Sequence, residues 1–311
     1  MSRRRIGRES FGFGGAERRH SSLDDLAKLI DWASVDQWLA DISCAAKGEP
    51  AWPPVALFKA LLLAVWYDLS DVKLAEALDD RASFRRFCGF SGADPTPERT
   101  AFVRFRKALT TRGLDEALFD GVTAQLKGKA IRVKTGTLVD ATIIASASKG
   151  DDEARWVKHK RKPAVHGFKA HVGADADTAL VEEIAVAPAN VHDGKAGGDA
   201  LPDDPGHVFA DSAYRGEMFR AAVRAKGGTP RIVTTHMWGR DEEETQAKLD
   251  AWNQPIHRIR GRIEKVFGTW KRSYGLRRIR WLGLAKASLQ IRLTAIAYNM
   301  RRTLSILAVA A

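Results

Sequence analysis

Three carboxylates in the second half of the sequence have surroundings that suit metal binding. Asp140 lies in the middle of an apolar, β-branched run (137–144), and Asp211 directly follows the short apolar run 208–210. Glu264 is the only acid in the last 58 residues, which hold 13 Lys and Arg. A lone charge within an apolar strand is costly unless a cation neutralises it. Carboxylate oxygens are the ligands that Mg²⁺ prefers, so three of them on separate elements could gather two ions.

Two such ions, roughly 3.5–4 Å apart, would activate a water or a 3′-hydroxyl and stabilise the leaving oxygen in phosphoryl transfer. Each carboxylate also has a simpler explanation. Asp140 could form a salt bridge or lie at an exposed edge of the sheet, and Asp211 could cap a helix N-terminus. Glu264 could form an ordinary i,i+4 pair with Arg260, which would contribute only a few tenths of a kcal/mol. That pair would not explain why Glu264 is the lone acid among so many bases.

The surroundings of Glu264 favour a role at a phosphate. At about 100° per residue, a helix places His257, Arg260, Glu264 and Lys271 on one stripe about 60° wide. Arg260 and Lys271 could then contact phosphate oxygens, which would position a nucleic-acid backbone without reading its sequence. Apolar side chains on other sides of this helix could hold it on a sheet, namely Ile259, Ile263, Val266 and Trp270.

Net charge points to a polyanionic partner. The chain has 311 residues and a formal net charge of +12. Residues 1–130 carry +2, residues 131–253 carry −2, and residues 254–311 carry the whole excess. A basic segment of this kind faces nucleic acid or a membrane surface more often than a neutral small molecule.

Composition excludes several classes of protein. Hydrophobic residues make up 45% and charged residues 28%, as in a globular chain. Cys44 and Cys88 are the only cysteines, which excludes a disulfide framework and a cysteine zinc site and fits a reducing cytoplasm. The longest apolar runs fall far short of the roughly 20 residues that span a bilayer, so we expect no membrane association.

Local signals divide the chain near residue 130. Before it, helices are expected from 53 to 67, from Ser70 to 78, and from about 96 to 109, with Gly89 ending a short helix between the last two. After it, a helix is expected from about Pro255. The remaining elements are strands at 137–144, 167–174, 180–187, 208–210 and 231–235, helices at 217–225 and 284–308, and a polar loop or short helix at 145–165.

This order predicts an α+β or α/β protein: a helical N-terminal domain followed by a mixed sheet covered by helices, compatible with an RNase H-like core. His192 and Asp193 could form a metal-ligand pair, although a helix cap at Asp193-Gly194 is the simpler explanation. Lys169 on its strand could contact DNA near the metals or be a solvated strand lysine.

Several motifs together resemble the DDE transposases of the insertion-sequence-five group, within the insertion-sequence-four-like superfamily. Their last acid lies in a pattern of Tyr, two residues, Arg, three residues, Glu, six residues and Lys. Here His257, Arg260, Glu264 and Lys271 fit every spacing, with His in place of Tyr. The other blocks that resemble the family are 97–100, 104–107, 138–142, 166–172, 188–193 and 210–214.

Composition and local signals predict a flexible basic leader at 1–20 and an all-helical, helix-turn-helix-like domain at 21–128, which we expect to bind DNA ends. The resemblance implies an RNase H-like catalytic domain at 131–303, followed by a tail at 304–311. It also implies Mg²⁺ dependence with two ions, for which Mn²⁺ could substitute, and cut-and-paste transposition of an insertion sequence.

The resemblance also assigns residues. Asp140, Asp211 and Glu264 map onto the catalytic, metal-binding triad. Arg260 and Lys271 map onto the signature cations at DNA, and His257 either replaces a phosphate-contacting hydroxyl or packs. Further candidate DNA contacts are Lys169, Arg104 and Arg106.

The partners implied are the terminal inverted repeats of the element, target DNA, and a second copy of the chain, since joining two ends requires at least a dimer. The setting implied is the bacterial cytoplasm, on the nucleoid. Two other functions stay open at this point. One is an RNase H-like nuclease without strand transfer. The other is a catalytically silent, transposase-derived DNA-binding regulator.

Overall fold

The computed structural model describes residue 4 and residues 6–7, 21–42, 50–130, 133–158 and 163–310. Most of the predicted basic leader at 1–20, as well as Cys44, lies outside these residues. The chain forms two compact units, each considered by itself. The helical unit contains the described residues up to Gly128, Ser273–Gly275 and Arg292 onward; the sheet unit contains Lys129–Arg272 and Leu276–Ile291.

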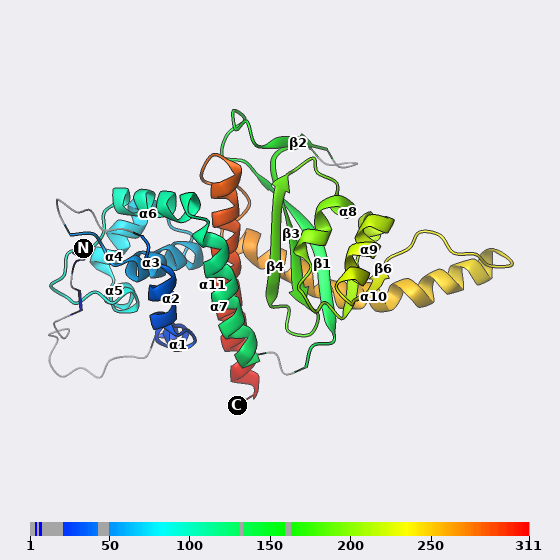
Figure 1. Ribbon diagram of the computed structural model, residues 1–311, viewed down its shortest axis with the longest axis horizontal. Helices are drawn as coiled ribbons and strands as arrows, with labels where there is room; N and C mark the ends of the chain where they lie inside the picture. The colour runs from blue at the N-terminus through cyan, green and yellow to red at the C-terminus, as the bar shows by residue number, and fades with distance from the viewer. Residues whose placement is uncertain are drawn as a thin grey trace. The chain divides into compact units, whose positions relative to one another are not determined.

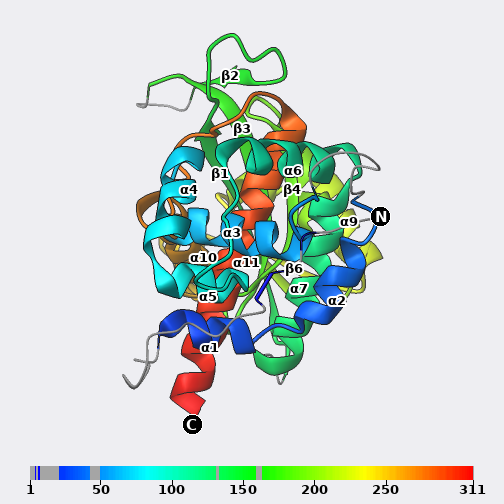
Figure 2. The ribbon, with the colours of Figure 1, turned by 90° about the vertical axis from the view of Figure 1, so that its left-hand side faces the viewer.

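The helical unit is built around helix α3 (Pro54–Trp66), which contacts α2, α4, α5 and α6. Ten of its 13 residues are buried, so it is apolar on nearly all sides, as a central helix must be. Trp66 extends the core by donating from Nε1 to the carbonyl of Ala297, at 2.9 Å. Figures 1 and 2 show these helices in blue to green. The others are α1 (Ser22–Lys28), α2 (Trp32–Trp38), α4 (Asp71–Asp80), α5 (Ala82–Cys88), α6 (Arg99–Thr111) and α7 (Leu114–Ala130).

Two predicted helix boundaries are confirmed by their caps. The Ser70 hydroxyl accepts a hydrogen bond from the Lys73 amide and caps α4. Gly89 ends α5 in the left-handed conformation, with φ of 88°, where a side chain would be strained. These local rules operate as the sequence predicts because each cap involves residues close together in the chain.

Arginines in the helical unit pair with aspartates inside the fold. Both terminal nitrogens of Arg106 donate to the two oxygens of Asp71, at 2.8 and 2.6 Å. Arg292 donates to Asp115 at 2.5 Å. We predicted Arg106 as a DNA contact, but the side chain is buried, because its position adjoins the apolar stripe of α6. Arg104, by contrast, is exposed.

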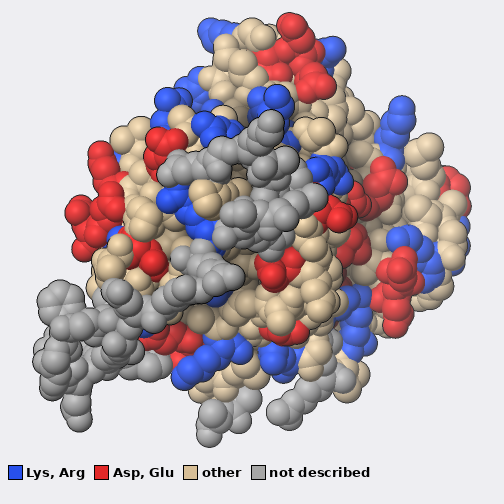
Figure 3. Space-filling model, turned by 60° about the vertical axis from the view of Figure 1, so that its left-hand side comes forward, with Lys and Arg blue, Asp and Glu red and all other residues tan. Residues whose placement is uncertain are grey.

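Charges of both signs share the protein surface. Lys and Arg are interspersed with Asp and Glu over the face drawn in Figure 3. This mixture agrees with the small net charge of residues 1–130. Individual exposed cations on this face, rather than a patch of one sign, are therefore the candidates for contact with a partner.

The sheet unit has the mixed sheet that we predicted, and its strand order is RNase H-like. The central strand β1 pairs antiparallel with β3 on one edge and parallel with β5 on the other. Strand β4 pairs antiparallel with β3, and β6 pairs parallel with β5. The strands are β1 (Gly136–Ala145), β2 (Arg155–Val157), β3 (Val165–Asp175), β4 (Val181–Pro188), β5 (His207–Ala210) and β6 (Thr229–Ile232).

Helices cover both faces of this sheet, as Figure 1 shows for the green and yellow segments. One face packs against α9 (Glu217–Ala225), with Phe219 and Val223 in a core that includes Val139 and Ala210. The other elements are α8 (Asp193–Ala196), the 3₁₀ turns η1 (Gly197–Ala200) and η2 (Ser212–Tyr214), α10 (Glu242–Arg272) and α11 (Leu284–Ala310).

Some predicted boundaries were wrong. Helix α10 begins at Glu242, not near Pro255, because Asp241 accepts from the Glu244 amide and caps an acidic first turn. Pro255 lies inside the helix. Strand β6 lies two to three residues before its predicted position, and the predicted 145–165 loop contains the short strand β2. The predicted tail is helical to Ala310 as part of α11.

The division of the last helix also differs from the predicted domain limits. Residues 292–303, which we placed in the catalytic domain, group with the helical unit. No helix within the described ranges is long and apolar enough to cross a membrane.

Candidate active site

Two of the three predicted carboxylates meet at the end of strand β5. The parallel register pairs Val139 of β1 with Ala210 of β5, so Asp140 and Asp211 come next on neighbouring strands. Side chains at matching positions of paired strands share a face of the sheet. The sequence could not show this, because the register of β1 and β5 joins segments about 70 residues apart.

A single guanidinium lies between these carboxylates. Nη2 of Arg260 donates to Oδ2 of Asp140 at 3.0 Å and lies 3.9 Å from Oδ2 of Asp211. Both aspartates therefore approach the same cationic nitrogen. Asp211 also accepts from the Ala213 amide and caps η2, so the simpler explanation of Asp211 holds together with the functional one.

Helix α10 brings Arg260 to the sheet. The helix contacts β1, β5 and β6, and its apolar side chains Ile263, Val266 and Trp270 are fully buried. Arg260 lies among them and is only 9% exposed, and its Nε has no hydrogen-bond partner among the described residues. A buried cation that is incompletely bonded is costly, and nearby carboxylates offset that cost.

Burial changes the acidity of Asp140. Removal from water raises its pKa to about 6, and the negative charge of Asp211 adds to this. The Arg260 guanidinium acts in the opposite direction but does not cancel the effect of burial. Asp140 therefore takes up a proton more readily than an ordinary aspartate, and a second cation beside it would stabilise its charged form.

Glu264 and His257 differ from Arg260 in their exposure. Both are exposed on α10, one turn after and about one turn before Arg260. Of the predicted stripe, Arg260 and Lys271 turn toward the sheet, while Glu264 and His257 turn toward solvent. Within the described ranges, no group of three or more His, Cys, Asp or Glu is close enough to hold a metal. The structure therefore assembles two of the three predicted ligands.

A cavity of about 380 Å³ lies along the free part of β1. Strand β5 pairs only with residues 136–139, so β1 runs on beyond its neighbour. Nζ of Lys271 donates to the carbonyl of Ile143 there, at 2.9 Å. Ligands commonly bind at such a place, beyond the carboxyl end of a strand in an open sheet. The lining residues are Ala141, Thr142, Ile143, Val157, Pro163, Val165, Lys169, Asp193 and Lys271.

Lys169, which also lines this cavity, is a buried polar residue on the face of the sheet opposite Asp140. Lys169 is opposite Ile143 in the register and is only 5% exposed. Its Nζ donates to Oδ1 of Asp193 and to the carbonyl of Val191, both at 2.8 Å. Lys169 is therefore neither a solvated strand lysine nor a free DNA contact. Asp193 is its ion-pair partner, while His192 caps α8 through Nδ1.

Sequence analysis assigned no role to two other buried groups near the site. His171 is fully buried, and burial lowers its pKa to about 4, so it is neutral. The Tyr214 hydroxyl is buried without a partner among the described residues; burial and the nearby Asp140 raise its pKa. One signal in the sequence was available: both belong to the motif blocks around Lys169 and Asp211.

Comparison with known proteins agrees with this geometry. The family model described as "Transposase DDE domain" matches residues 131–300, more than half of the chain. The chain belongs to this family. It is a DNA-cleaving transposase, and a second transposase domain model matches residues 14–108. The finer placement in the insertion-sequence-five group is compatible with both matches and stays a prediction.

Among solved structures, the transposase is similar to piggyBac transposase in a synaptic complex with hairpin DNA. The two share 9% sequence identity with a TM-score of 0.46, over 93% of this chain and 80% of the other.

Proposed function

We propose that this transposase cuts and joins DNA strands with divalent metal held by Asp140, Asp211 and Glu264. DDE transposases generally use divalent metal ions; the choice of Mg²⁺ or Mn²⁺, and of two ions, is part of the proposal. The main support is the approach of Asp140 and Asp211 to one Arg260 nitrogen. A pair of carboxylates that converges on one cation suits a hard divalent ion. The inclusion of Glu264 rests on its spacing from Arg260.

Bound divalent ions would polarise the scissile phosphate and lower the barrier to attack by a water or a 3′-hydroxyl. Arg260 holds the aspartates in their positions and balances their charge. To free the carboxylate oxygens, the guanidinium must move aside, and DNA phosphate oxygens are a suitable new partner for it.

Other side chains hold the strands that carry the aspartates. Lys271 ties α10 to the free edge of β1 through the Ile143 carbonyl. The pair of Lys169 and Asp193 fixes β3 to the start of α8. Catalytic ligands need such support, because displacements of about 1 Å can reduce rates a hundredfold. These two lysines therefore position the site whether or not they also contact phosphate.

In the hydrolytic step, the oxygen of water attacks the scissile phosphorus and the bond to the 3′-oxygen breaks. The water proton leaves to solvent, and the 3′-oxygen takes up a proton to give a free 3′-hydroxyl and a 5′-phosphate. In strand transfer, that 3′-hydroxyl attacks a target phosphate in the same way. The proposed substrates are the terminal repeats of the element and target DNA, bound by an assembly of at least two copies.

For the helical unit, we propose contact with the DNA ends through exposed cations such as Arg104 on α6. Arg106 is left out, since both of its terminal nitrogens bind Asp71. We also propose that the protein acts in the bacterial cytoplasm, on the nucleoid.

The decisive test replaces each acid by its amide. Asp140→Asn, Asp211→Asn and Glu264→Gln should each lower the rate of metal-dependent cleavage of an element end by at least about a thousandfold, since loss of the metal removes several kcal/mol of stabilisation. Binding of the ends should change little. Asp204→Asn, an exposed carboxylate in the same unit, is the matched control and should cleave normally.

Wild-type cleavage by any of the three variants would remove that residue from the triad. A joining assay with labelled target DNA then separates a transposase from a nuclease without strand transfer. Absence of cleavage by the wild type on a correct end would leave the catalytically silent regulator as the alternative.

A further inference from the structure

A segment of the sheet unit extends from the sheet as an arm, defined here as residues 233–255. It follows β6 and includes the first half of α10, and Figure 1 shows it in yellow, pointing away from the strands. The arm carries five acidic and two basic side chains, hence a net charge of −3. This contrasts with residues 254–311, which carry +12.

The base of the arm is held firmly. Trp252 donates from its indole nitrogen to the Ile232 carbonyl at 2.8 Å, and the Arg231 guanidinium lies over its ring. Asn253 makes two hydrogen bonds with the backbone of Thr234, at 3.0 and 2.9 Å. These hydrogen bonds join the end of β6 and the segment after it to helix α10 and so fix the base of the arm.

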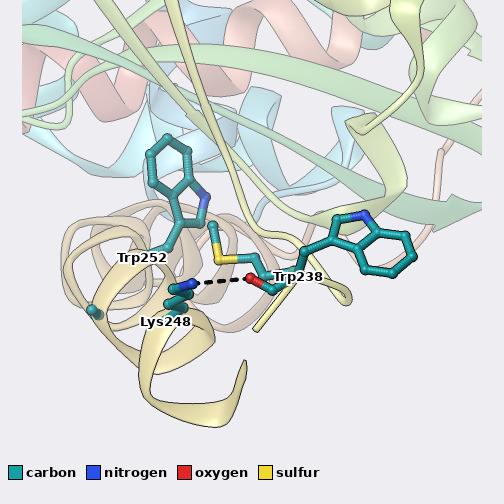
Figure 4. A pocket seen from close by; sticks show the side chains of 5 residues that line it. Trp238, Lys248 and Trp252 are labelled. Atoms are coloured by element: carbon teal, nitrogen blue, oxygen red, sulfur yellow. Dashed lines mark hydrogen bonds between the residues drawn. The ribbon is translucent and has the colours of Figure 1, made fainter. Parts of the chain in front are cut away.

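That surface contains an open pocket of about 440 Å³. It is lined by Met237, Trp238, Lys248, Ala251 and Trp252, and Figure 4 shows the indoles of Trp238 and Trp252 with Lys248. Nζ of Lys248 donates to the Trp238 carbonyl at 3.1 Å and so fixes one wall.

Trp238 itself is 86% exposed, although its ring contacts His236. A largely exposed tryptophan beside an open apolar pocket marks an interaction site. Tryptophan also loses little conformational entropy when a partner covers it, which makes it an effective anchor.

The charge around the pocket restricts the partner. Arg240 and Lys248 both pair with Glu244, at 2.9 Å each. Asp241, Glu242, Glu243 and Asp250 are exposed elsewhere on the arm and make its surface acidic. Such a surface repels DNA phosphates and favours a basic protein surface. A second copy of the transposase supplies one in its basic segment.

We propose that the arm binds a second copy of this chain, with Trp238 as the apolar anchor and the acidic surface of the arm facing basic side chains of residues 254–311. This interface does not include Asp140, Asp211 or Glu264, so it can be tested independently of the proposed metal site. It gives the two copies a contact that does not require DNA.

The test measures self-association of the full-length protein by sedimentation velocity, with and without an element end. Trp238→Ala should weaken the dimer at least tenfold, as loss of an anchor residue does. Trp156→Ala is the matched control, because Trp156 is a half-exposed tryptophan on β2 in the same unit. A double charge reversal, Glu242→Lys with Glu243→Lys, should weaken the dimer as well, and more so at low salt.

A photo-crosslinking residue, p-benzoylphenylalanine in place of Trp238, identifies what lies on the pocket. The expected product is a covalent dimer in which the adduct maps to residues 254–311 of the other copy. A DNA adduct would overturn the proposal and show instead that the pocket stacks on a base. A monomeric wild type under all conditions, equal dimer strength in Trp238→Ala, or absence of any protein adduct would also overturn it.

Discussion

Both units of the transposase bury an arginine beside aspartate, but they do so differently. In the helical unit, Arg106 gives one nitrogen to each oxygen of Asp71. In the sheet unit, one nitrogen of Arg260 is shared between Asp140 and Asp211, and its Nε has no partner within the described ranges. Arg106 and Asp71 balance each other's charge, whereas Asp140 and Asp211 share the single positive charge of Arg260.

This difference separates structural charge from functional charge. A bidentate pair satisfies both partners and has no need of a ligand. A guanidinium shared by two carboxylates leaves one negative charge in excess, and the pKa of Asp140 is raised to about 6. Both arginines are buried and both pair with aspartate, so these two properties do not distinguish the sites. The sites differ in the balance of charge and in the number of polar atoms that have a hydrogen-bond partner.

The largest expected effect on stability is at the pair of Arg106 and Asp71. Asp71→Ala leaves the Arg106 guanidinium buried without its main partner, which should cost about 3–5 kcal/mol in the free energy of unfolding. Asp80→Ala, an exposed carboxylate at the other end of α4, is the control and should stay within about 0.5 kcal/mol. Urea unfolding measures both. A small loss for Asp71→Ala would mean that the pair is not the structural element we describe.

The next effect concerns the buried His171 of the sheet unit, whose folded pKa of about 4 lies below its unfolded value of 6.5. Between these values the unfolded state takes up a proton that the folded state does not, so stability falls as pH falls from 6.5 to 4. The full loss from this group is about 3 kcal/mol. His171→Leu should flatten this part of the pH profile of unfolding; an unchanged profile would contradict a buried neutral histidine.

Arg260→Met tests whether the sheet unit holds a cation between its aspartates. Without divalent metal, the variant should be less stable than the wild type, because Asp140 and Asp211 lose their shared partner. With metal, it should gain more than the wild type, since no guanidinium competes; about 2.7 kcal/mol is expected at a concentration 100-fold above the dissociation constant. Thermal unfolding with Mg²⁺ or Mn²⁺ measures the gain. Equal gains in both proteins would show that Arg260 and metal do not compete.

The smallest expected change in stability is at Glu264. Its side chain is exposed, so Glu264→Gln should shift the unfolding free energy by less than about 0.5 kcal/mol. The same variant should be inactive if Glu264 is a metal ligand. A large stability loss would instead make Glu264 a structural residue and weaken the contrast with Asp71.

Most elements of the fold were predictable because their signals are local. The helix caps at Ser70 and Gly89 and the apolar run around Asp140 each specify structure within a few residues. Helix α10 shows where this fails: the proline at 255 predicted a start, yet the acidic turn capped by Asp241 began the helix earlier. A proline inside a helix costs one backbone hydrogen bond, and here the packing of the helix on the sheet outweighs that cost.

The roles of the cations were less predictable. Arg106 and Lys169 were expected at DNA, but both form buried ion pairs with aspartates distant in the sequence. Spacing on a helix or strand predicts the direction of a side chain from its own element. It does not predict which residues of other elements pack against that side chain. Those residues decide whether a cation is available to a phosphate.

The sequence by itself determined the residue types of the site, the order of the strands and helices, and the concentration of positive charge in the last 58 residues. These are properties of composition and short-range pattern. Only the tertiary structure decided that Asp140 and Asp211 share the Arg260 nitrogen, that Glu264 faces solvent, and that Trp238 is exposed on an acidic arm. Each of these depends on strand register and helix packing between distant segments, where the free energy of burial, and not local preference, selects the arrangement.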